Sequence, residues 1–319
     1  ALRPYCMWQS RRKGQRLYAR HDCIMELQFL DHALRRHRNR IYHFIYAEKS
    51  FQLTADYAHR LKNRGHRIVG TVHHMLKQQQ HFFRSHDHFK HFDLLLTMDR
   101  ASLEFWRGVT ARNNVRWIGN GVDTEYFVPL DSSRPEPRCH NVVFAGSHER
   151  DFETLRHCIE LLRSDQGFRF DLIGDFPFLV RTESEFANVT VHRDVSDIEY
   201  RRIMQNASVL LLPLHASTVC NVVLEAMACG TPVVTTAGGI ECYLEPENSI
   251  IAGTGDAACL VDGVRFLADR QGPARLAARK AAEQFSWPVA ATRHVAAYEA
   301  LWSGDCSVTC EPERSQNNR

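Results

Sequence analysis

Short apolar runs alternate with longer stretches of helical spacing along the whole chain. Runs of four to seven residues that are rich in valine, isoleucine and leucine predict buried strands. In the first part of the chain, strands are expected at residues 41–46, 67–72, 92–98 and 115–118. Apolar residues at helical spacing mark residues 24–34 and residues 51–65, where Gly65 is the expected last position of the helix.

A stretch rich in proline, serine and charge, residues 128–140, ends this first pattern and predicts a linker. The alternation then restarts, with strands expected in NVVFAG, FRFDLIG, VTVH, SVLLLPL, PVVTT and SIIA. Helices are expected at residues 151–164, 197–206, 221–229 and 256–269, and a separate helix follows near the end. Such alternation is typical of a parallel sheet covered on both faces, so two doubly wound α/β domains that face a cleft are predicted.

The pattern divides the chain into four parts: a first domain at residues 1–128, a second at 129–286, a helix at 287–302 and a tail at 303–319. The tail is polar, and we expect it to be disordered. In doubly wound folds, ligands bind beyond the carboxyl ends of the strands. Functional residues are therefore expected directly after the strands.

Composition narrows the choice of function. Hydrophobic residues make up 44% of the chain, and no apolar run is long enough to cross a bilayer. The start shows no signal-peptide pattern, which predicts a cytoplasmic location. The ten cysteines are scattered, and Cys306 and Cys310 lack nearby histidines, so a zinc site is not expected.

The net charge of +3 hides a strongly basic beginning, RRKGQR and LRRHRNR. Three interpretations stay open: a solvated helix face, a site for a phosphate-bearing substrate, or peripheral contact with an anionic membrane at its inner face. No nucleic-acid-binding module is visible, so nucleic acid is not an expected partner. No D-x-D triplet occurs, which argues against a carboxylate-held metal–nucleotide site.

One carboxylate interrupts an apolar helix, Glu225 in NVVLEAMACGTPVV. The helix begins after the SVLLLPL strand and a polar loop, so its free N–H groups would form an anion site suited to a diphosphate. Glu225 lies about one turn further along and could accept hydrogen bonds from two adjacent hydroxyls, such as those of a ribose. It could equally meet solvent or an arginine, and the pattern alone does not choose.

This segment resembles the signature of retaining GT-B glycosyltransferases of family 4, the glycosyl transferases group 1 type. Glu225 matches the second of two signature glutamates, which in the family holds the nucleotide ribose. The first glutamate falls on Ser217, a departure that bears on donor choice or activity. IGNGVDTEYFVP resembles the interdomain segment, FAGSHERDFETL the turn after the first donor-domain strand, and FSWPVAATRHVAAYEALW the last helix.

The resemblance implies a GT-B fold with an acceptor-side first domain, which is reduced because only Gly14 could represent the usual glycine-rich loop. The second domain would bind a nucleotide sugar. The resemblance places the donor near Arg150, His148, Ser217, Thr218, Asn221, Glu225, Gly238 and Gly239. Arg150 could instead be an exposed arginine at a helix start, and Asn221 could bond the loop backbone.

In the first domain, GTVHHM resembles the strand end that carries a histidine near the reacting sugars. His73 is the catalytic candidate, with a structural histidine as the alternative. Alternation along the strand would turn His74 to the other face. Glu48, which follows the strand at 41–46, is a weaker candidate.

The resemblance implies transfer of a sugar from a nucleotide-diphosphate sugar to an acceptor hydroxyl, with retention and without metal or other cofactor. Such hexosyltransferase-type enzymes act in the synthesis of polysaccharides, glycolipids and other glycoconjugates, on glycan, lipid-linked or small-molecule acceptors. A non-catalytic GT-B relative that binds a nucleotide sugar or glycan and assists a partner is the alternative. A sugar-nucleotide epimerase is a third hypothesis.

Overall fold

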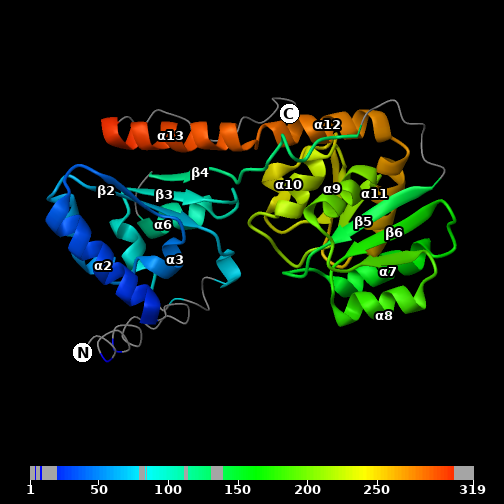
Figure 1. Cartoon of the computed structure of the whole chain (residues 1–319), viewed down its shortest axis with the longest axis horizontal. Coiled ribbons are helices and arrows are strands. Elements are labelled where there is room, and N and C mark those ends of the chain that lie inside the picture. Colours follow the sequence, from blue (N-terminus) through cyan, green and yellow to red (C-terminus); the bar gives the residue numbers. More distant parts are fainter. Residues whose placement is uncertain are drawn as a thin grey trace. The chain divides into compact units, whose positions relative to one another are not determined.

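The computed structural model describes residues 20–78, 83, 85–110, 114–130 and 139–304, together with Pro4 and Trp8. Gly14, Cys306, Cys310, the run RRKGQR, most of the predicted linker and most of the predicted tail lie outside the described residues. The chain forms two units, drawn in Figure 1. One comprises Ala1–Gly119 with Ala291–Arg319, and the other comprises Asn120–Ala290.

The first unit contains a parallel sheet whose strands follow one another in chain order, β1-β2-β3-β4. Its strands are β1 (Ile41–Phe44), β2 (Arg67–Val72), β3 (Leu94–Thr97) and β4 (Val115–Trp117). Its helices are α2 (Arg20–Arg36), α3 (Ala47–Ser50), η1 (Thr54–Tyr57), α4 (Ala58–Lys62), η2 (Asp87–His91) and α6 (Leu103–Thr110). All four strands predicted here are confirmed, three of them with shorter ends.

The helix predicted at residues 51–65 is two shorter pieces, η1 and α4. Gly65 follows α4 with φ of +78°, the left-handed conformation expected of the residue that ends a helix. Gly70 allows dense packing inside this unit, because a Cβ on it would lie 2.6 Å from the Phe92 ring. The sheet also packs on α13 (Trp287–Ser303), where Ala297 joins a buried cluster with Val69 and Leu96.

The second unit contains a six-stranded parallel sheet in the order β10-β9-β8-β5-β6-β7. Its strands are β5 (His140–Ala145), β6 (Phe168–Ile173), β7 (Val189–His192), β8 (Val209–Leu212), β9 (Val233–Thr236) and β10 (Ser249–Ala252). Its helices are α7 (Phe152–Leu162), α8 (Pro177–Glu185), α9 (Asp197–Asn206), α10 (Asn221–Ala228), η3 (Ile240–Tyr243), α11 (Ala257–Ala268) and α12 (Gln271–Glu283).

The strand order of the second sheet reverses between β5 and β8, because the chain runs outward through β6 and β7 before it returns. This reversal is the switch point of a doubly wound fold, where ligands bind. Helices α7 and α8 lie on one side of the sheet, and α10 and α12 on the other (Figure 1). Among the described strands, the first sheet has no such reversal, so the doubly wound order applies to the second sheet.

The units divide at residues 119/120 and 290/291, whereas the sequence placed boundaries at 128/129 and 286/287. Residues 120–130 count with the second unit because side chains of α9 bind their backbone. Arg201 donates to the carbonyl of Tyr126 (3.1 Å), and Gln205 donates to that of Val128 (2.7 Å). These bonds cannot be read from the apolar pattern that located the linker.

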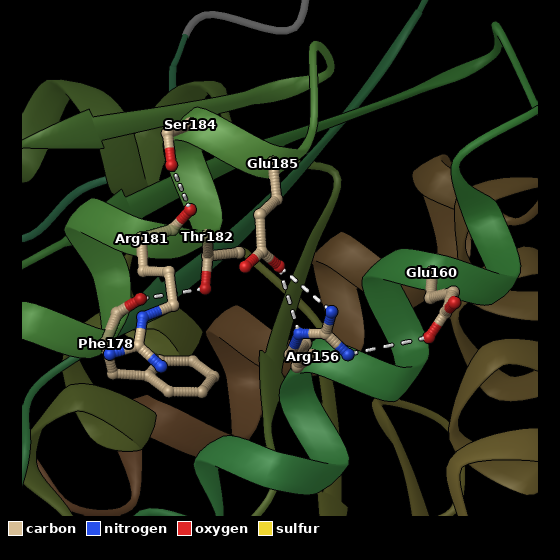
Figure 2. Close-up of polar contacts among 7 residues, drawn as sticks. All are labelled: Arg156, Glu160, Phe178, Arg181, Thr182, Ser184 and Glu185. Carbon is tan, nitrogen blue, oxygen red and sulfur yellow. Dashed lines mark hydrogen bonds and ion pairs between the residues drawn. The ribbon is translucent and has the colours of Figure 1, made fainter.

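Helices α7 and α8 are joined at their surface by Arg156 (Figure 2). Its Nη2 lies 3.0 Å from Oε2 of Glu185 in α8, and its Nη1 lies 3.7 Å from Oε2 of Glu160 one turn along α7. Water reaches all three side chains, so these ion pairs contribute little to stability. Arg156 is therefore a surface arginine of the second unit with a defined local role.

Candidate functional site

The loops after β5 and β8 meet at the switch point of the second sheet. Arg150 and Leu214 form an isolated antiparallel bridge. Next to it, the amide of Asp151 donates to the carbonyl of Pro213 (3.0 Å), and the amide of His215 donates to the carbonyl of Glu149 (3.0 Å). These bonds fix the two loops against each other at the edge where doubly wound folds bind ligands.

The guanidinium of Arg150 is held in place at this edge. Its Nε donates to the carbonyl of Ala145 (3.0 Å), Nη1 to the carbonyl of His148 (3.0 Å) and Nη2 to Sγ of Cys220 (3.4 Å). A guanidinium has about five N–H donors, so after these three bonds about two remain for a ligand. Arg150 is partly buried and fixed by these bonds, so it is not the exposed arginine at a helix start that the sequence offered as the alternative.

Gly146, which directly follows β5, leaves room for this arrangement. Its φ is +87°, and a Cβ there would lie 2.9 Å from Nη2 of Arg150. The predicted second cation, His148, differs from Arg150 because its side chain is exposed while its carbonyl accepts from Arg150. The structure thus gives His148 a backbone role in orienting the arginine.

Helix α10 begins beside Arg150. Its N-cap is Cys220, whose side chain makes no capping hydrogen bond, so the first N–H groups of the helix are not taken by the cap. Asn221 is exposed, and its Oδ1 accepts from Nδ2 of Asn120 (2.8 Å). Asn221 therefore bonds a side chain of the NGVD segment, which differs from the loop-backbone partner that the sequence offered as the alternative to donor binding.

The loop before α10 is closed by its own bonds. Oγ of Ser217 donates to the carbonyl of Val219 (2.9 Å), and the amide of Ser217 donates to the carbonyl of Gly238 (2.9 Å). Thr218, which follows, is buried. The hydroxyl of Ser217, at the position where the sequence resemblance expects a carboxylate, is thus bonded within the loop.

Gly238 and Gly239 approach this loop closely. Their φ angles are +156° and +115°, and a Cβ on Gly239 would clash with the carbonyl of Ser217. Their amides donate to the carboxylate of Glu241, at 2.7 Å and 2.6 Å. Sequence reasoning missed Glu241, although a carboxylate two residues after a glycine pair can bond back to its amides in this way.

Glu225 is half-buried in α10, and its Oε2 accepts a hydrogen bond of 2.6 Å from the hydroxyl of Tyr200 in α9. Burial raises the pKa of Glu225, the hydrogen bond from Tyr200 acts in the opposite direction, and Asp197 raises it further. Burial and the Glu225 carboxylate raise the pKa of Tyr200 well above its usual value. From the sequence, solvent, an arginine or a ligand was expected as the partner of Glu225. The partner in the structure, Tyr200, was not predicted.

The histidine pair of the first unit lies directly after β2. Oε1 of Glu48, a fully buried residue of α3, accepts from the amides of His73 (2.6 Å) and His74 (2.8 Å). The ring of His73 stacks on Tyr46 with 4.3 Å between ring centroids. Since β2 ends at Val72, strand alternation does not extend to His73 and His74, whose backbone amides both turn to one oxygen of Glu48.

Burial also sets the charges of this first-unit cluster. Burial lowers the pKa of His73, and the nearby Glu48 carboxylate acts in the opposite direction. Burial raises the pKa of Glu48, and the hydrogen bonds from the amides of His74 and His73 act in the opposite direction. A further histidine, His43 of β1, lies between the hydroxyls of Tyr298 and Thr71, at 2.7 Å from each. Burial, followed by His294 and His73, lowers the pKa of His43 to about 4, so it is neutral at pH 7. Sequence reasoning did not single out His43.

In the described part of the chain, no three His, Cys, Asp or Glu side chains gather as a metal site would require. No helix of the described residues has the length and apolar character needed to cross a membrane.

Residues 139–270 match a known family model, glycosyl transferases group 1. The match covers every predicted donor residue of the second unit and leaves His73 outside. Sulfoquinovosyl transferase SQD2 of Arabidopsis thaliana is 30% identical over an alignment of 210 residues, and the match covers 58% of this chain and 40% of that protein. D-inositol 3-phosphate glycosyltransferase 1 of Catenulispora acidiphila is 36% identical over 226 residues, 61% of this chain and 53% of that protein. The chain thus spans about half the length of these curated relatives.

Solved structures extend the likeness to both units. Sucrose-phosphate synthase from Thermosynechococcus elongatus matches with a TM-score of 0.67 at 17% identity, over 88% of this chain and 78% of that chain. The apo form of the lipopolysaccharide outer core galactosyltransferase WaaB matches with a TM-score of 0.66 at 16% identity, over 88% and 79%. The α/β fold with two parallel sheets therefore matches that of GT-B glycosyltransferases, as predicted.

Proposed function

We propose that the chain is a hexosyltransferase-type glycosyltransferase that moves a sugar from a nucleotide-diphosphate sugar to an acceptor hydroxyl, with retention and without metal. The observation that carries the proposal is the grouping of Arg150, the start of α10 and Glu225 in one unit, within the range that matches glycosyl transferases group 1. A cation, open helix N–H groups and a carboxylate are the partners that a diphosphate and a ribose need.

In this proposal, the diphosphate of the donor lies between the two remaining N–H groups of Arg150 and the first amides of α10. Negative charge grows on the diphosphate as the sugar departs, and donors that are already fixed lower the barrier without having to reorganise. Arg150 is such a donor because three bonds hold its guanidinium before any ligand arrives. Oε1 of Glu225 accepts from the ribose, so Glu225 contributes mainly to binding.

His73 is proposed to hydrogen-bond a sugar hydroxyl close to the reacting carbon. Glu48 supports this role, since it fixes the backbone of His73 and His74 from inside the first unit. Stacking on Tyr46 further restricts the imidazole ring. Because burial lowers the pKa of His73, a neutral ring that both donates and accepts is the expected form.

The names of the relatives support an acceptor in glycolipid, polyol or polysaccharide synthesis, since they include a sulfoquinovosyl transferase, a D-inositol 3-phosphate glycosyltransferase and a glycogen synthase. We propose action at the cytoplasmic side of a membrane. Peripheral contact would use the basic segment that begins with Arg35 and Arg36 at the end of α2 and continues to Arg40, which can attract anionic headgroups.

A non-catalytic function is the second candidate, and Ser217 favours it. Serine places a hydroxyl where the family's first signature glutamate has a carboxylate. This hydroxyl is already bonded to the carbonyl of Val219. A protein of this kind would bind a nucleotide sugar or glycan, keep it intact and assist a partner.

A two-step experiment tests the proposal. Thermal unfolding is first measured with a panel of UDP-, GDP- and ADP-sugars, because a ligand at a hundred times its dissociation constant stabilises by roughly 2.7 kcal/mol. The nucleotide sugar that stabilises the chain is then incubated with and without glycan, polyol and lipid acceptors, and released nucleoside diphosphate is measured. Release supports the transferase, whereas binding without release supports the second candidate. Absence of stabilisation by the whole panel contradicts the transferase and also a second candidate that binds a nucleotide sugar.

A further inference from the structure

The contact between Tyr200 and Glu225 joins two helices of the second unit. The hydroxyl of Tyr200 in α9 donates to Oε2 of Glu225 in α10 over 2.6 Å. Hydrogen bonds of a hydroxyl to a carboxylate are short and about twice as strong as neutral ones. Tyr200 is the polar side chain that meets this carboxylate within the described residues.

The bond restricts how Glu225 can meet a ligand. A glutamate side chain has several rotatable bonds, and fixing them on binding costs free energy. In this unit the cost is met before binding, because Tyr200 holds Oε2 and leaves Oε1 as the oxygen for a ligand. Tyr200 is itself ordered by packing, since its ring lies 6.2 Å from that of Phe127, measured between centroids.

We propose that Tyr200 is a positioning residue of the nucleotide site, which holds Glu225 so that Oε1 accepts a hydroxyl of a nucleotide ribose. This inference rests on the proposed function and adds a residue that the family signature does not contain. It assigns to α9, which lies outside that signature, a share of the nucleotide affinity.

The charge state of Glu225 supports this role. Burial raises the pKa of the carboxyl group, and the hydrogen bond from Tyr200 lowers it. Tyr200 thereby favours the ionised form, which only accepts hydrogen bonds. The titratable groups that act on the pair are Asp197 of α9 and Cys220 and Cys229 at the ends of α10. Around Cys229 lie the charged side chains of Arg201, Arg275 and Arg279.

The test is calorimetric titration of the whole chain with UDP, GDP and ADP, from about pH 8 down to about pH 5, the range in which a raised carboxyl pKa would show. We expect Tyr200→Phe to lower affinity about tenfold at neutral pH, the loss of one hydrogen bond to a charged group. We also expect affinity to disappear at a higher pH than in the wild type. Without the hydroxyl, the carboxyl group of Glu225 takes up its proton earlier as the pH falls.

Two variants separate positioning from general stabilisation. In a Glu225→Ala background, Tyr200→Phe should change affinity less than about twofold, because its effect passes through Glu225. Tyr126→Phe is the matched control, since the buried hydroxyl of Tyr126 has no partner among the described residues. This control should bind nucleotide as the wild type does.

Several results would overturn the proposal. Wild-type affinity and pH profile in Tyr200→Phe, with or without a lower melting temperature, would make Tyr200 a packing residue. An equal loss in the Glu225→Ala background would do the same. A wild-type chain that binds none of the three nucleotides overturns the proposed function itself, and this inference with it.

Discussion

Arg150 offers the sharpest test of the nucleotide site, through the change Arg150→Ala. Three bonds hold its guanidinium at the switch point, and about two N–H groups remain for a diphosphate. A hydrogen bond to a charged group contributes about 1.5–3 kcal/mol, and the two would share one ligand. We therefore expect a loss of about 2–4 kcal/mol in binding a nucleoside diphosphate, roughly thirtyfold to a thousandfold in affinity.

The loss should depend on the phosphates. Calorimetric titration of wild type and variant with a nucleoside diphosphate and with the matching nucleoside measures this, and the nucleoside should lose little affinity. The affinity of Arg150→Lys for the nucleoside diphosphate should lie between those of the wild type and Arg150→Ala. An ammonium keeps the charge but cannot reproduce the two parallel N–H donors of the guanidinium.

Arg156→Ala is the matched control, since Arg156 is an exposed arginine of the same unit whose partners are Glu160 and Glu185 (Figure 2). It should bind both ligands as the wild type does. Equal losses for nucleoside and nucleoside diphosphate in Arg150→Ala would refute the phosphate assignment. They would show that Arg150 only joins the loops after β5 and β8.

Three further changes test other parts of the structure. Glu225→Ala should weaken nucleotide binding by about 2–3 kcal/mol in a folded protein, and unchanged affinity in calorimetry would end the ribose assignment. His73→Ala should lower nucleoside diphosphate release about tenfold, with nucleotide affinity kept, and His74→Ala should lower it less; the reverse order would make His74 the site residue. His43 is a base whose folded pKa, about 4, lies below its ordinary 6.5, so the folded state binds the proton less well and stability is lost as the pH falls from 6.5 toward 4. Denaturant unfolding should show this as a loss of about 1–2 kcal/mol in the free energy of unfolding between pH 7 and pH 5, with a smaller slope in His43→Gln.

Local chemistry in the sequence determined most of the elements of the second unit. Helix α9 begins at residue 197, as predicted, because Ser196 and Glu199 form a capping box. Asp151 and Asp256 are the N-caps of α7 and α11, and each side chain accepts from an amide three residues on. Such starts, like the buried strand β8, depend on residues that are neighbours along the chain, so a single sequence contains the information.

The residue types of the candidate site were also visible in the sequence, because parallel strands bring their carboxyl ends to one edge. This rule placed Arg150 and Asn221 correctly at the edge of the second sheet. In the first unit, His73 also lies directly after a strand, β2, whereas Glu48 does not follow its strand directly. There β1 ends at Phe44, so Glu48 falls inside α3 and is buried beneath the histidine pair.

Only the tertiary structure decided which polar atoms meet. Tyr200 and Glu225 are 25 residues apart on two helices, and Glu48 is 25 residues from His73. The apolar spacing of a helix fixes which side is buried, but the polar partner found there depends on how far the neighbouring helix is shifted and turned. A carboxylate that leaves water must find a donor, and the packing of α9 on α10 determines that this donor is Tyr200.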